Sequence, residues 1–257
     1  MNIILSGSGG RMGREVAHFV SERGHGDRIV CGIGRAENAP FPTVRSFSEA
    51  ECDEDFSLAS AHADVIVDFS NRAATGGLVR FAVSRCLPLV IATTGQNEND
   101  FSVINAAAKS VPVFLSANMS TGVALLSALV RTAAAALPES DIEIVETHHA
   151  DKEDAPSGTA LMLVGELKSV RGGCTPVCGR HGSGVRKKNE IGVHSIRMGG
   201  EAGKHTVMFA SPWQTVTISH AAHSRAVYAD GAIRAAHFII EKKAGLYTMA
   251  DLLGGNV

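Results

Sequence analysis

The sequence has no excess of positive charge. Its 24 lysines and arginines are balanced by 26 aspartates and glutamates, which leaves a formal net charge of -2 at pH 7. Aromatic residues make up only 5% of the chain, and no run of lysine or arginine is interleaved with them. Because binding to a nucleic acid backbone depends on clustered positive charge, we expect no nucleic acid partner.

Long hydrophobic runs are also missing, although 45% of the residues are hydrophobic. The longest apolar stretches fall well short of the roughly 20 residues that a membrane-spanning helix needs. The chain opens with a strand-like segment from Asn2 rather than with the charged and then apolar segments of a secretory leader. We therefore expect a cytoplasmic protein that does not use a membrane.

Cysteine is scarce, and its number is odd. A disulfide framework would leave one thiol unpaired among Cys31, Cys52, Cys86, Cys174 and Cys178. Cys174 and Cys178 are near enough in sequence to chelate, but no second pair of Cys or His follows at the spacing of a zinc site. We expect reduced thiols and no bound metal.

The first half of the chain contains a series of short apolar runs. Segments with helical spacing or turn residues separate these runs, which lie at 3–5, 29–33, 65–69, 89–92 and 113–115. Strands that are buried on both faces and alternate with helices are typical of a parallel sheet, and right-handed crossovers wind such a sheet doubly. The pattern predicts an α/β fold with a nucleotide-binding architecture.

The pattern changes after Asn118. An alanine-rich stretch at 123–137 predicts a buried helix that ends at Pro138, and 142–146 predicts the next strand. Further strands, parted by Gly, Ser and Pro rather than by helices, are predicted at 192–198, 205–210 and 216–220. This indicates a second, α+β domain with an open mixed sheet, and we expect another subunit to cover the face that its helices leave bare.

A glycine-rich turn follows the first predicted strand directly. It reads Gly7, Ser8, Gly9, Gly10, Arg11, Met12 and Gly13. Glycines let the backbone turn tightly and approach a pyrophosphate, whose charge is then met by N–H groups of the following helix and here also by Arg11. The spacing departs from the common Gly-x-Gly-x-x-Gly, and a plain connector is the alternative. We predict a dinucleotide site at this turn.

The predicted C-terminal helix gives the domain boundaries. Its apolar residues recur at helical spacing over 230–243, so that it can return to the first domain. We therefore predict that 1–118 and 229–257 form the dinucleotide-binding domain. Residues 119–228 then form a domain for substrate binding and oligomerisation.

The end of the second predicted strand bears on the choice of cofactor. An NAD site commonly carries an acid here for the ribose hydroxyls, whereas this chain has Gly34 followed by Arg35. Arg35 can bind a 2′-phosphate through its planar guanidinium, so we expect NADPH to be used at least as well as NADH. The alternative is an arginine in a solvated loop.

The densest group of proton carriers is the segment ETHHADKEDAPSGTA at 146–160. His148 and His149 follow a predicted strand, on which successive side chains point to opposite faces, so the two cannot do the same job. An imidazole and the ammonium of Lys152 make a plausible pair of acids at neutral pH. Ser157 is a predicted helix cap, and the N–H groups of the residues after it can bind a carboxylate. The alternatives are a simple cap beside a solvated loop and a metal site on His-His-Asp.

These motifs resemble the dihydrodipicolinate reductase family. The likeness runs from end to end and rests on GSGGRMG, DFS at 68–70, ATTG at 92–95, ANMS at 117–120 and, above all, the segment at 146–160. The resemblance implies a Rossmann-like domain, a central substrate domain and a homotetramer. It also implies reduction of 4-hydroxy-tetrahydrodipicolinate, by way of dihydrodipicolinate, to tetrahydrodipicolinate in the diaminopimelate route to lysine.

The resemblance also implies roles for particular residues. His148 would donate or accept the proton, Lys152 would be the second proton donor, and the substrate would contact His149, Ser157, Gly158, Thr159 and Thr94. The nicotinamide cofactor, NADPH or NADH, would be held by Gly7, Ser8, Gly9, Gly10, Arg11, Met12, Arg35, Phe69, Ala92, Thr93, Thr94, Ser116, Ala117, Asn118 and Met119.

Two features of this chain depart from the family pattern. Gly34 replaces the acid that commonly binds the adenosine ribose, and Lys204 replaces the glutamate of a Gly-Glu-His-Thr segment. The first favours NADPH, and the second lies outside the expected chemistry. Two other functions stay open, namely a different nicotinamide-dependent imine or amino-acid dehydrogenase and a protein that senses nicotinamide cofactors without turnover.

Overall fold

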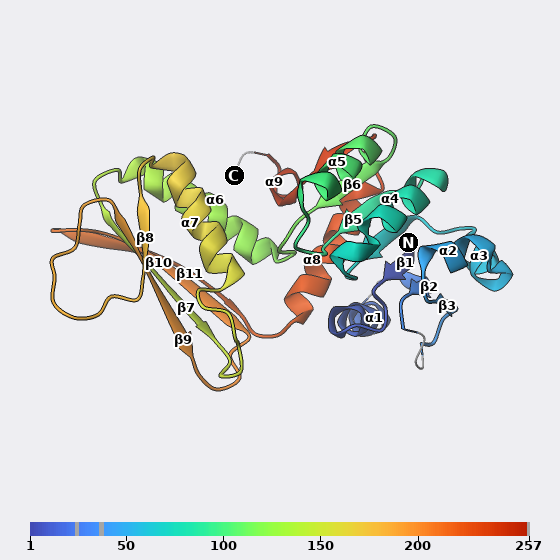
Figure 1. Cartoon of the computed structure of the whole chain (residues 1–257), viewed down its shortest axis with the longest axis horizontal. Helices are drawn as coiled ribbons and strands as arrows, with labels where there is room; N and C mark the ends of the chain where they lie inside the picture. The colour runs from blue at the N-terminus through green and yellow to red at the C-terminus, as the bar shows by residue number, and fades with distance from the viewer. Residues whose placement is uncertain (24–25, 36–38, 256–257) are drawn as a thin grey trace. The chain divides into compact units, whose positions relative to one another are not determined.

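The computed structural model describes residues 1–23, 26–35 and 39–255. The chain divides into two compact units (Figure 1). The first comprises residues 1–120 and the described part of 225–256, and the second is Thr121–Ser224. Each unit has its own sheet.

The first unit is built on a parallel sheet of short apolar strands. In the described residues its strands lie in the order β12-β6-β5-β4-β1-β2-β3. Their bounds are β1 Asn2–Ser6, β2 Arg28–Ile33, β3 Thr43–Val44, β4 Val65–Asp68, β5 Leu89–Ile91, β6 Pro112–Leu115 and β12 Gly245–Tyr247. The order reverses direction between β1 and β4, which is where open α/β sheets bind ligands at the carboxyl ends of their strands.

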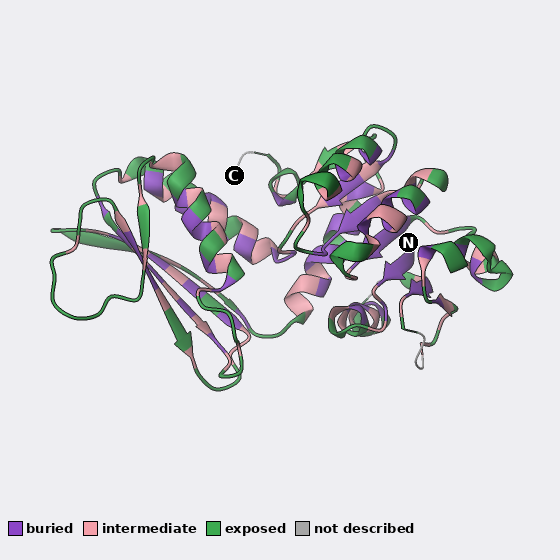
Figure 2. Cartoon of the chain, in the orientation of Figure 1, coloured by how far each residue is buried: buried purple, intermediate pink, exposed green. Residues whose placement is uncertain are grey.

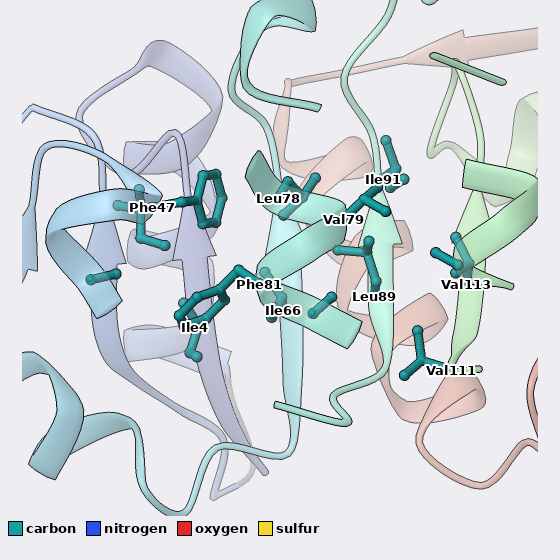
Figure 3. Close-up of a cluster of buried hydrophobic side chains, with 14 of the residues drawn as sticks. Ile4, Phe47, Ile66, Leu78, Val79, Phe81, Leu89, Ile91, Val111 and Val113 are labelled. Carbon is teal, nitrogen blue, oxygen red and sulfur yellow. The ribbon is translucent and has the colours of Figure 1, made fainter. Parts of the chain in front are cut away.

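Helices cover both faces of this sheet, because alternate strand residues are apolar on both sides. The face with Ile4, Ile66 and Leu89 packs with Phe47 and Phe81 in one buried cluster (Figure 3). The helices of that layer are α2 Phe47–Cys52, α3 Glu54–Ser60, α4 Thr75–Ser84 and α5 Glu98–Ala107, with the 3-10 turn Arg72–Ala74 before α4. The other layer is formed by α1 Arg11–Arg23 and α8 Ala226–Ile239, and the short α9 Met249–Leu252 packs on α8.

The second unit places two helices on one face of a mixed sheet. The strand order in the described residues is β11-β10-β7-β9-β8; β7, β8 and β9 run parallel, while β10 is antiparallel to both β7 and β11. Its elements are α6 Thr121–Ala136, β7 Asp141–His148, α7 Gly158–Val170, β8 Thr175–Cys178, β9 Glu190–Arg197, β10 Gly203–Ser211 and β11 Gln214–Ala222. Leu126 of α6 and Leu163 of α7 share a core with Ile144, Val193 and Val207 of the sheet.

Burial differs between the two sheets (Figure 2). The central strand β4 is buried at every residue, whereas β7 alternates buried and partly exposed residues along most of its length. Continuous burial, as in β4, is typical of a sheet covered on both faces, and alternating burial, as in β7, is typical of a sheet covered on one face. The predicted fold class, a doubly wound parallel sheet with a second open mixed sheet, is therefore confirmed.

Several details differ from the sequence-based expectation. The C-terminal helix α8 runs over Ala226–Ile239, so it overlaps the predicted helix at 230–243 but both begins and ends a few residues earlier. The two-residue strand β3 and the three-residue strand β12 were not predicted, because so short a segment carries no periodicity. None of the described helices is long and apolar enough to cross a membrane.

Candidate active site

The glycine turn between β1 and α1 permits a close approach that larger residues would block. Gly7 has a φ of +78°, and a Cβ there would lie 2.4 Å from the carbonyl oxygen of Phe69. A Cβ on Gly13 would lie 2.1 Å from the carbonyl oxygen of Gly7. The turn is closed by the Gly10 N–H, which donates to the Gly7 carbonyl at 2.9 Å. The backbone can therefore come close to a ligand at the start of α1.

A pocket of about 700 Å³ opens beside this turn. Six predicted cofactor residues line it, namely Gly7, Gly9, Gly10, Arg11, Arg35 and Phe69. Ser8 and Met12 belong to the same turn and helix start but do not line the pocket; Ser8 is buried and Met12 partly exposed. A glycine turn that a Cβ would fill, beside fixed positive charge, fits the phosphates of a dinucleotide.

The pocket is more cationic than the sequence indicated. Besides Arg11 and Arg35 it is lined by Arg14, Arg45 and Arg80. Arg14 follows Arg11 by three residues on α1, so helical spacing could have found it. Arg45 and Arg80 reach the pocket only because β3, α2 and α4 fold beside β1 and β2, which no local pattern predicts.

The remaining predicted cofactor residues follow β5 and β6. Backbone hydrogen bonds tie the residue after each strand to the neighbouring strand at the carboxyl edge of the sheet. Ala92 N, after β5, donates to Asp68 O of β4 at 2.9 Å, and Ser116 N, after β6, donates to Ile91 O of β5 at 3.1 Å. They do not line the 700 Å³ pocket, although they lie on the same sheet edge. The residues concerned are Ala92, Thr93, Thr94, Ser116, Ala117, Asn118 and Met119.

In the second unit, three adjacent strands change from apolar to polar at the same end of the sheet. The parallel pairing sets Ser195 opposite Glu146 and Arg197 opposite His148, and the antiparallel pairing sets His205 opposite Glu146. Because strand side chains alternate between faces, these residues continue the helix-covered face. At the other end of that face each strand carries apolar residues, namely Ile142 and Ile144 on β7, Ile191 and Val193 on β9, and Phe209 and Val207 on β10.

Glu146 is the centre of this polar group and is fully buried. Its Oε2 lies 2.5 Å from His148 Nδ1, and Arg197 donates to both carboxylate oxygens, at 2.8 and 2.9 Å. Burial acts to raise the pKa of Glu146, but hydrogen bonds from Arg197, Ser195 and His148 outweigh it and hold the pKa at about 2. The side chain is therefore an ionised carboxylate at neutral pH.

A second buried imidazole lies beside His148. The ring of His205 meets that of His148 edge-on, with 5.2 Å between the centroids, and its Nε2 is 3.0 Å from Ser157 Oγ. Burial, with a smaller effect from the neighbouring His148, lowers the pKa of His205 to about 4. His205 is therefore uncharged at neutral pH.

Ser157 joins the strand network to the start of α7. Its N–H donates to Glu146 at 3.2 Å, and its Oγ accepts from Ala160 N at 3.2 Å, which caps the helix as predicted. Gly158 and Thr159 are the first residues of α7. The structure thus brings His148, Ser157 and this helix start together.

Lys152 and His149 lie in the turn between β7 and α7. Lys152 Nζ pairs with Asp154 at 2.6 Å, and in the described part of the chain it makes no hydrogen bond to His148. His149 is partly exposed, and its N–H donates to Glu201 O at 2.8 Å. The two histidines have different surroundings, because β7 ends at His148 and His149 begins the turn.

In the second unit, the sequence did not single out Glu146, Arg197 and His205, which lie around His148 in the structure. Glu146 precedes His148 by two residues, so strand periodicity could have placed it on the same face. Arg197 and His205 join only through the pairing of β7 with β9 and β10. The arrangement as a whole can hold and orient one imidazole for proton transfer next to a helix N-terminus that binds anions.

A doubly wound sheet with a dinucleotide turn, together with a unit that holds an ordered imidazole, defines a dinucleotide-dependent oxidoreductase of the Rossmann type. Family models described as the N-terminus and the C-terminus of dihydrodipicolinate reductase match residues 1–119 and 122–253. The chain belongs to the dihydrodipicolinate reductase family.

Individual relatives agree with this assignment. The chain is 42% identical over 256 residues to 4-hydroxy-tetrahydrodipicolinate reductase of Caldanaerobacter subterraneus subsp. tengcongensis, covering 98% of each chain. It is 40% identical over 253 residues to the enzyme of the same name from Staphylococcus epidermidis, covering 98% of this chain and 100% of that one. Dipicolinate-bound dihydrodipicolinate reductase from Paenisporosarcina sp. TG-14 has the same fold, with a TM-score of 0.80 at 21% identity and 98% coverage of both chains.

Proposed function

We propose that this protein reduces 4-hydroxy-tetrahydrodipicolinate, by way of dihydrodipicolinate, to tetrahydrodipicolinate in the diaminopimelate route to lysine. Membership of the family supports the reaction. The single observation in the structure that supports it best is His148, held by a buried carboxylate beside the N-terminus of α7. A bound nicotinamide supplies the hydride, so the protein has to bind, orient and protonate the substrate.

His148 is the proposed proton donor. Its Nδ1 is occupied by Glu146, so Nε2 is the ring atom left for a substrate. Lys152, partly exposed in the adjoining turn, is the proposed second donor and supplies positive charge for a dicarboxylate. The proton goes to the ring carbon that becomes electron-rich when the hydride adds to the conjugated imine.

The first residues of α7 form the proposed carboxylate site. Gly158 and Thr159 begin a helix of 13 residues, whose N-terminal N–H groups and dipole favour an anion. Ser157 fixes this helix start to Glu146 and His205. The remaining substrate contacts that we propose are His149 and, from the first unit, Thr94. Holding the substrate in one orientation supplies a large part of the rate enhancement.

We propose that Arg35 binds the 2′-phosphate of NADPH, with NADH as the weaker or equal cofactor. Arg35 lines the 700 Å³ pocket, next to Arg45 and opposite the glycine turn, where a Cβ on Gly9 would lie 2.6 Å from the Cβ of Arg35. Arg35→Ala should lower kcat/KM for NADPH by about tenfold or more while changing kcat/KM for NADH little, the scale expected for losing a charged hydrogen-bond partner. An unchanged ratio of the two values would remove Arg35 from this role.

We also propose a homotetramer, in which the substrate-binding unit provides the contacts between subunits. The face of the mixed sheet opposite α6 and α7 has few buried residues, and β9 leaves Ile196 41% exposed on it. Another subunit can cover such a face. Light scattering on the purified protein measures this, and a monomer across the working concentration range would contradict it.

The direct test follows nicotinamide absorbance. Purified protein is mixed with NADPH and the fresh product of dihydrodipicolinate synthase, and in parallel with simple oxo acids and ammonia. We expect oxidation of NADPH only with the first substrate. His148→Gln should lower kcat by about 10²-fold or more and leave the Kd for NADPH nearly unchanged, since it removes a positioned acid. Wild-type turnover by that variant would refute the role of His148.

A further inference from the structure

The ring of His148 is held from three strands. On its own strand, Glu146 lies 2.5 Å from Nδ1, and on β9 Arg197 binds the same carboxylate. On β10, His205 packs edge-on against the ring, and a Cβ on Gly203 would lie 3.1 Å from Nε2. The His148 side chain is 11% exposed, so little room is left for other ring orientations.

The protonation of Glu146 determines which nitrogen of His148 carries hydrogen. With its pKa at about 2, the carboxylate can only accept hydrogen bonds at neutral pH. Nδ1 must therefore donate, which leaves Nε2 as the atom that gains or loses a proton. Arg197 occupies one further position on each carboxylate oxygen, and Ser157 N donates to Oε1, so the carboxylate cannot rotate away.

We propose that Glu146, fixed by Arg197, is a positioning residue that keeps His148 in the Nδ1–H tautomer and directs Nε2 at the substrate. This inference rests on the proposed function, because it assigns Nε2 as the atom through which His148 transfers its proton. Among the described residues, the charged and titratable groups around His148 are Glu146, Arg197 and the uncharged His205, with Lys152 in the adjoining turn acting electrostatically on His205. Glu146 itself does not touch the substrate in this scheme.

Replacing Glu146 by Gln should invert the tautomer. The side-chain amide has one acceptor, and Arg197 with Ser157 N supplies several donors, so the amide oxygen turns to them. The amide NH₂ then faces Nδ1, which has to accept, and the ring proton moves to Nε2. A wrong tautomer of this kind costs a catalytic imidazole about 10²- to 10⁴-fold in turnover.

The first test needs no substrate. Nitrogen-15 NMR of histidine-labelled wild-type protein above pH 8 separates the two tautomers, and the His148 signal is identified by its loss in His148→Gln. We expect the Nδ1–H tautomer in the wild type and the Nε2–H tautomer in Glu146→Gln. An Nε2–H tautomer in the wild type overturns the proposal, even if Glu146→Gln does not fold.

The second test is kinetic. Glu146→Gln should lower kcat by about 10²-fold, change the KM for substrate much less, and move the alkaline limb of the kcat/KM profile to lower pH. In the double variant Glu146→Gln/Arg197→Met, the amide oxygen is free to turn back to Nδ1. That variant should restore the Nδ1–H tautomer, and its kcat should be about tenfold higher than that of Glu146→Gln.

The opposite face of β7 offers a matched control. There Glu143 binds His194 Nε2 at 2.8 Å and Arg186 Nε at 3.3 Å, which repeats the same three residue types away from the site. Glu143→Gln should change kcat less than twofold. A folded Glu146→Gln with wild-type turnover, or lost turnover with the Nδ1–H tautomer intact, overturns the proposal. Wild-type turnover of His148→Gln would instead refute the proposed role of His148, whatever tautomer NMR finds, and no oxidation of NADPH by the wild type with the product of dihydrodipicolinate synthase would refute the proposed function.

Discussion

Glu146→Gln should also change how stability depends on pH. The pKa of Glu146 is about 2 in the folded protein, against 4.5 for a glutamate exposed to solvent, so folding favours the ionised form. Each pH unit between these values corresponds to about 1.4 kcal/mol, which gives about 3 kcal/mol of stability at pH 7. Because the folded pKa is the lower one, this stability is present above about pH 4.5 and is lost as the pH falls towards about 2.

The variant lacks the titrating carboxylate and resembles the protonated form of Glu146. The free energy of unfolding should therefore be about 3 kcal/mol higher in the wild type than in the variant at pH 7. Linkage reduces this gap to about 1 kcal/mol at pH 3, where the unfolded chain is almost fully protonated at this position and the folded chain is not. Urea unfolding monitored by circular dichroism measures both values.

Glu153→Gln is the control for this experiment, since Glu153 lies exposed in the same unit. Its free energy of unfolding should stay within about 0.5 kcal/mol of the wild type at both pH values, as is usual for exposed positions. A gap for Glu146→Gln that is the same at pH 7 and pH 3 would refute the assignment of a depressed pKa. A gap below about 1 kcal/mol at pH 7 would show that Arg197 and Ser157 do not stabilise the carboxylate as argued.

Three glycine and arginine variants test other parts of the structure. Gly13→Ala places a Cβ 2.1 Å from the Gly7 carbonyl oxygen, so it should lower the free energy of unfolding by about 1–3 kcal/mol and raise the Kd for NADPH. Thermal unfolding and fluorescence titration measure the two effects, and Gly165→Ala, in open space, is the control. Gly203→Ala places a methyl 3.1 Å from His148 Nε2, and the ring cannot move away because Glu146 holds it. The variant should therefore lower kcat about tenfold and leave the Kd for NADPH unchanged. Gly200→Ala, in open space, should leave kcat unchanged, and equal activity of the two variants would contradict the orientation of Nε2. Arg171 donates to the carbonyls of Ala134, Leu137 and Ser140 in and just after the last turn of α6, so Arg171→Met should cost about 1–3 kcal/mol in urea unfolding. Arg131→Met, on the exposed side of α6, should cost less than about 1 kcal/mol.

The main strands and the glycine turn could be predicted because their signals are local. The first three residues of β4, 65–67, are apolar, and such a run has to be buried wherever it lies. Gly7 and Gly13 follow the first strand at the spacing of a turn that no larger side chain could form. The cap at Ser157 was likewise predicted from its residue type and position.

The residues around the site were harder to predict. Arg45 follows a two-residue strand and Arg80 lies within α4, and both line the 700 Å³ pocket although neither belongs to a sequence motif. The bounds of α8 at Ala226 and Ile239 were also misplaced, because the spacing of apolar residues does not mark where a helix begins or ends. The sequence pattern of one segment does not show which other segment packs against it.

The sequence by itself determined that this chain folds into alternating strands and helices with a dinucleotide turn, and that one segment concentrates proton carriers. Residue type and periodicity along the chain are enough for both. Only the tertiary structure decided that Arg197 and His205, far along the chain, meet Glu146 and His148, because strand pairing sets β9 and β10 on either side of β7. The physical reason is that register is fixed by the burial of whole strands against α6 and α7, and it is this register that gives His148 its partners.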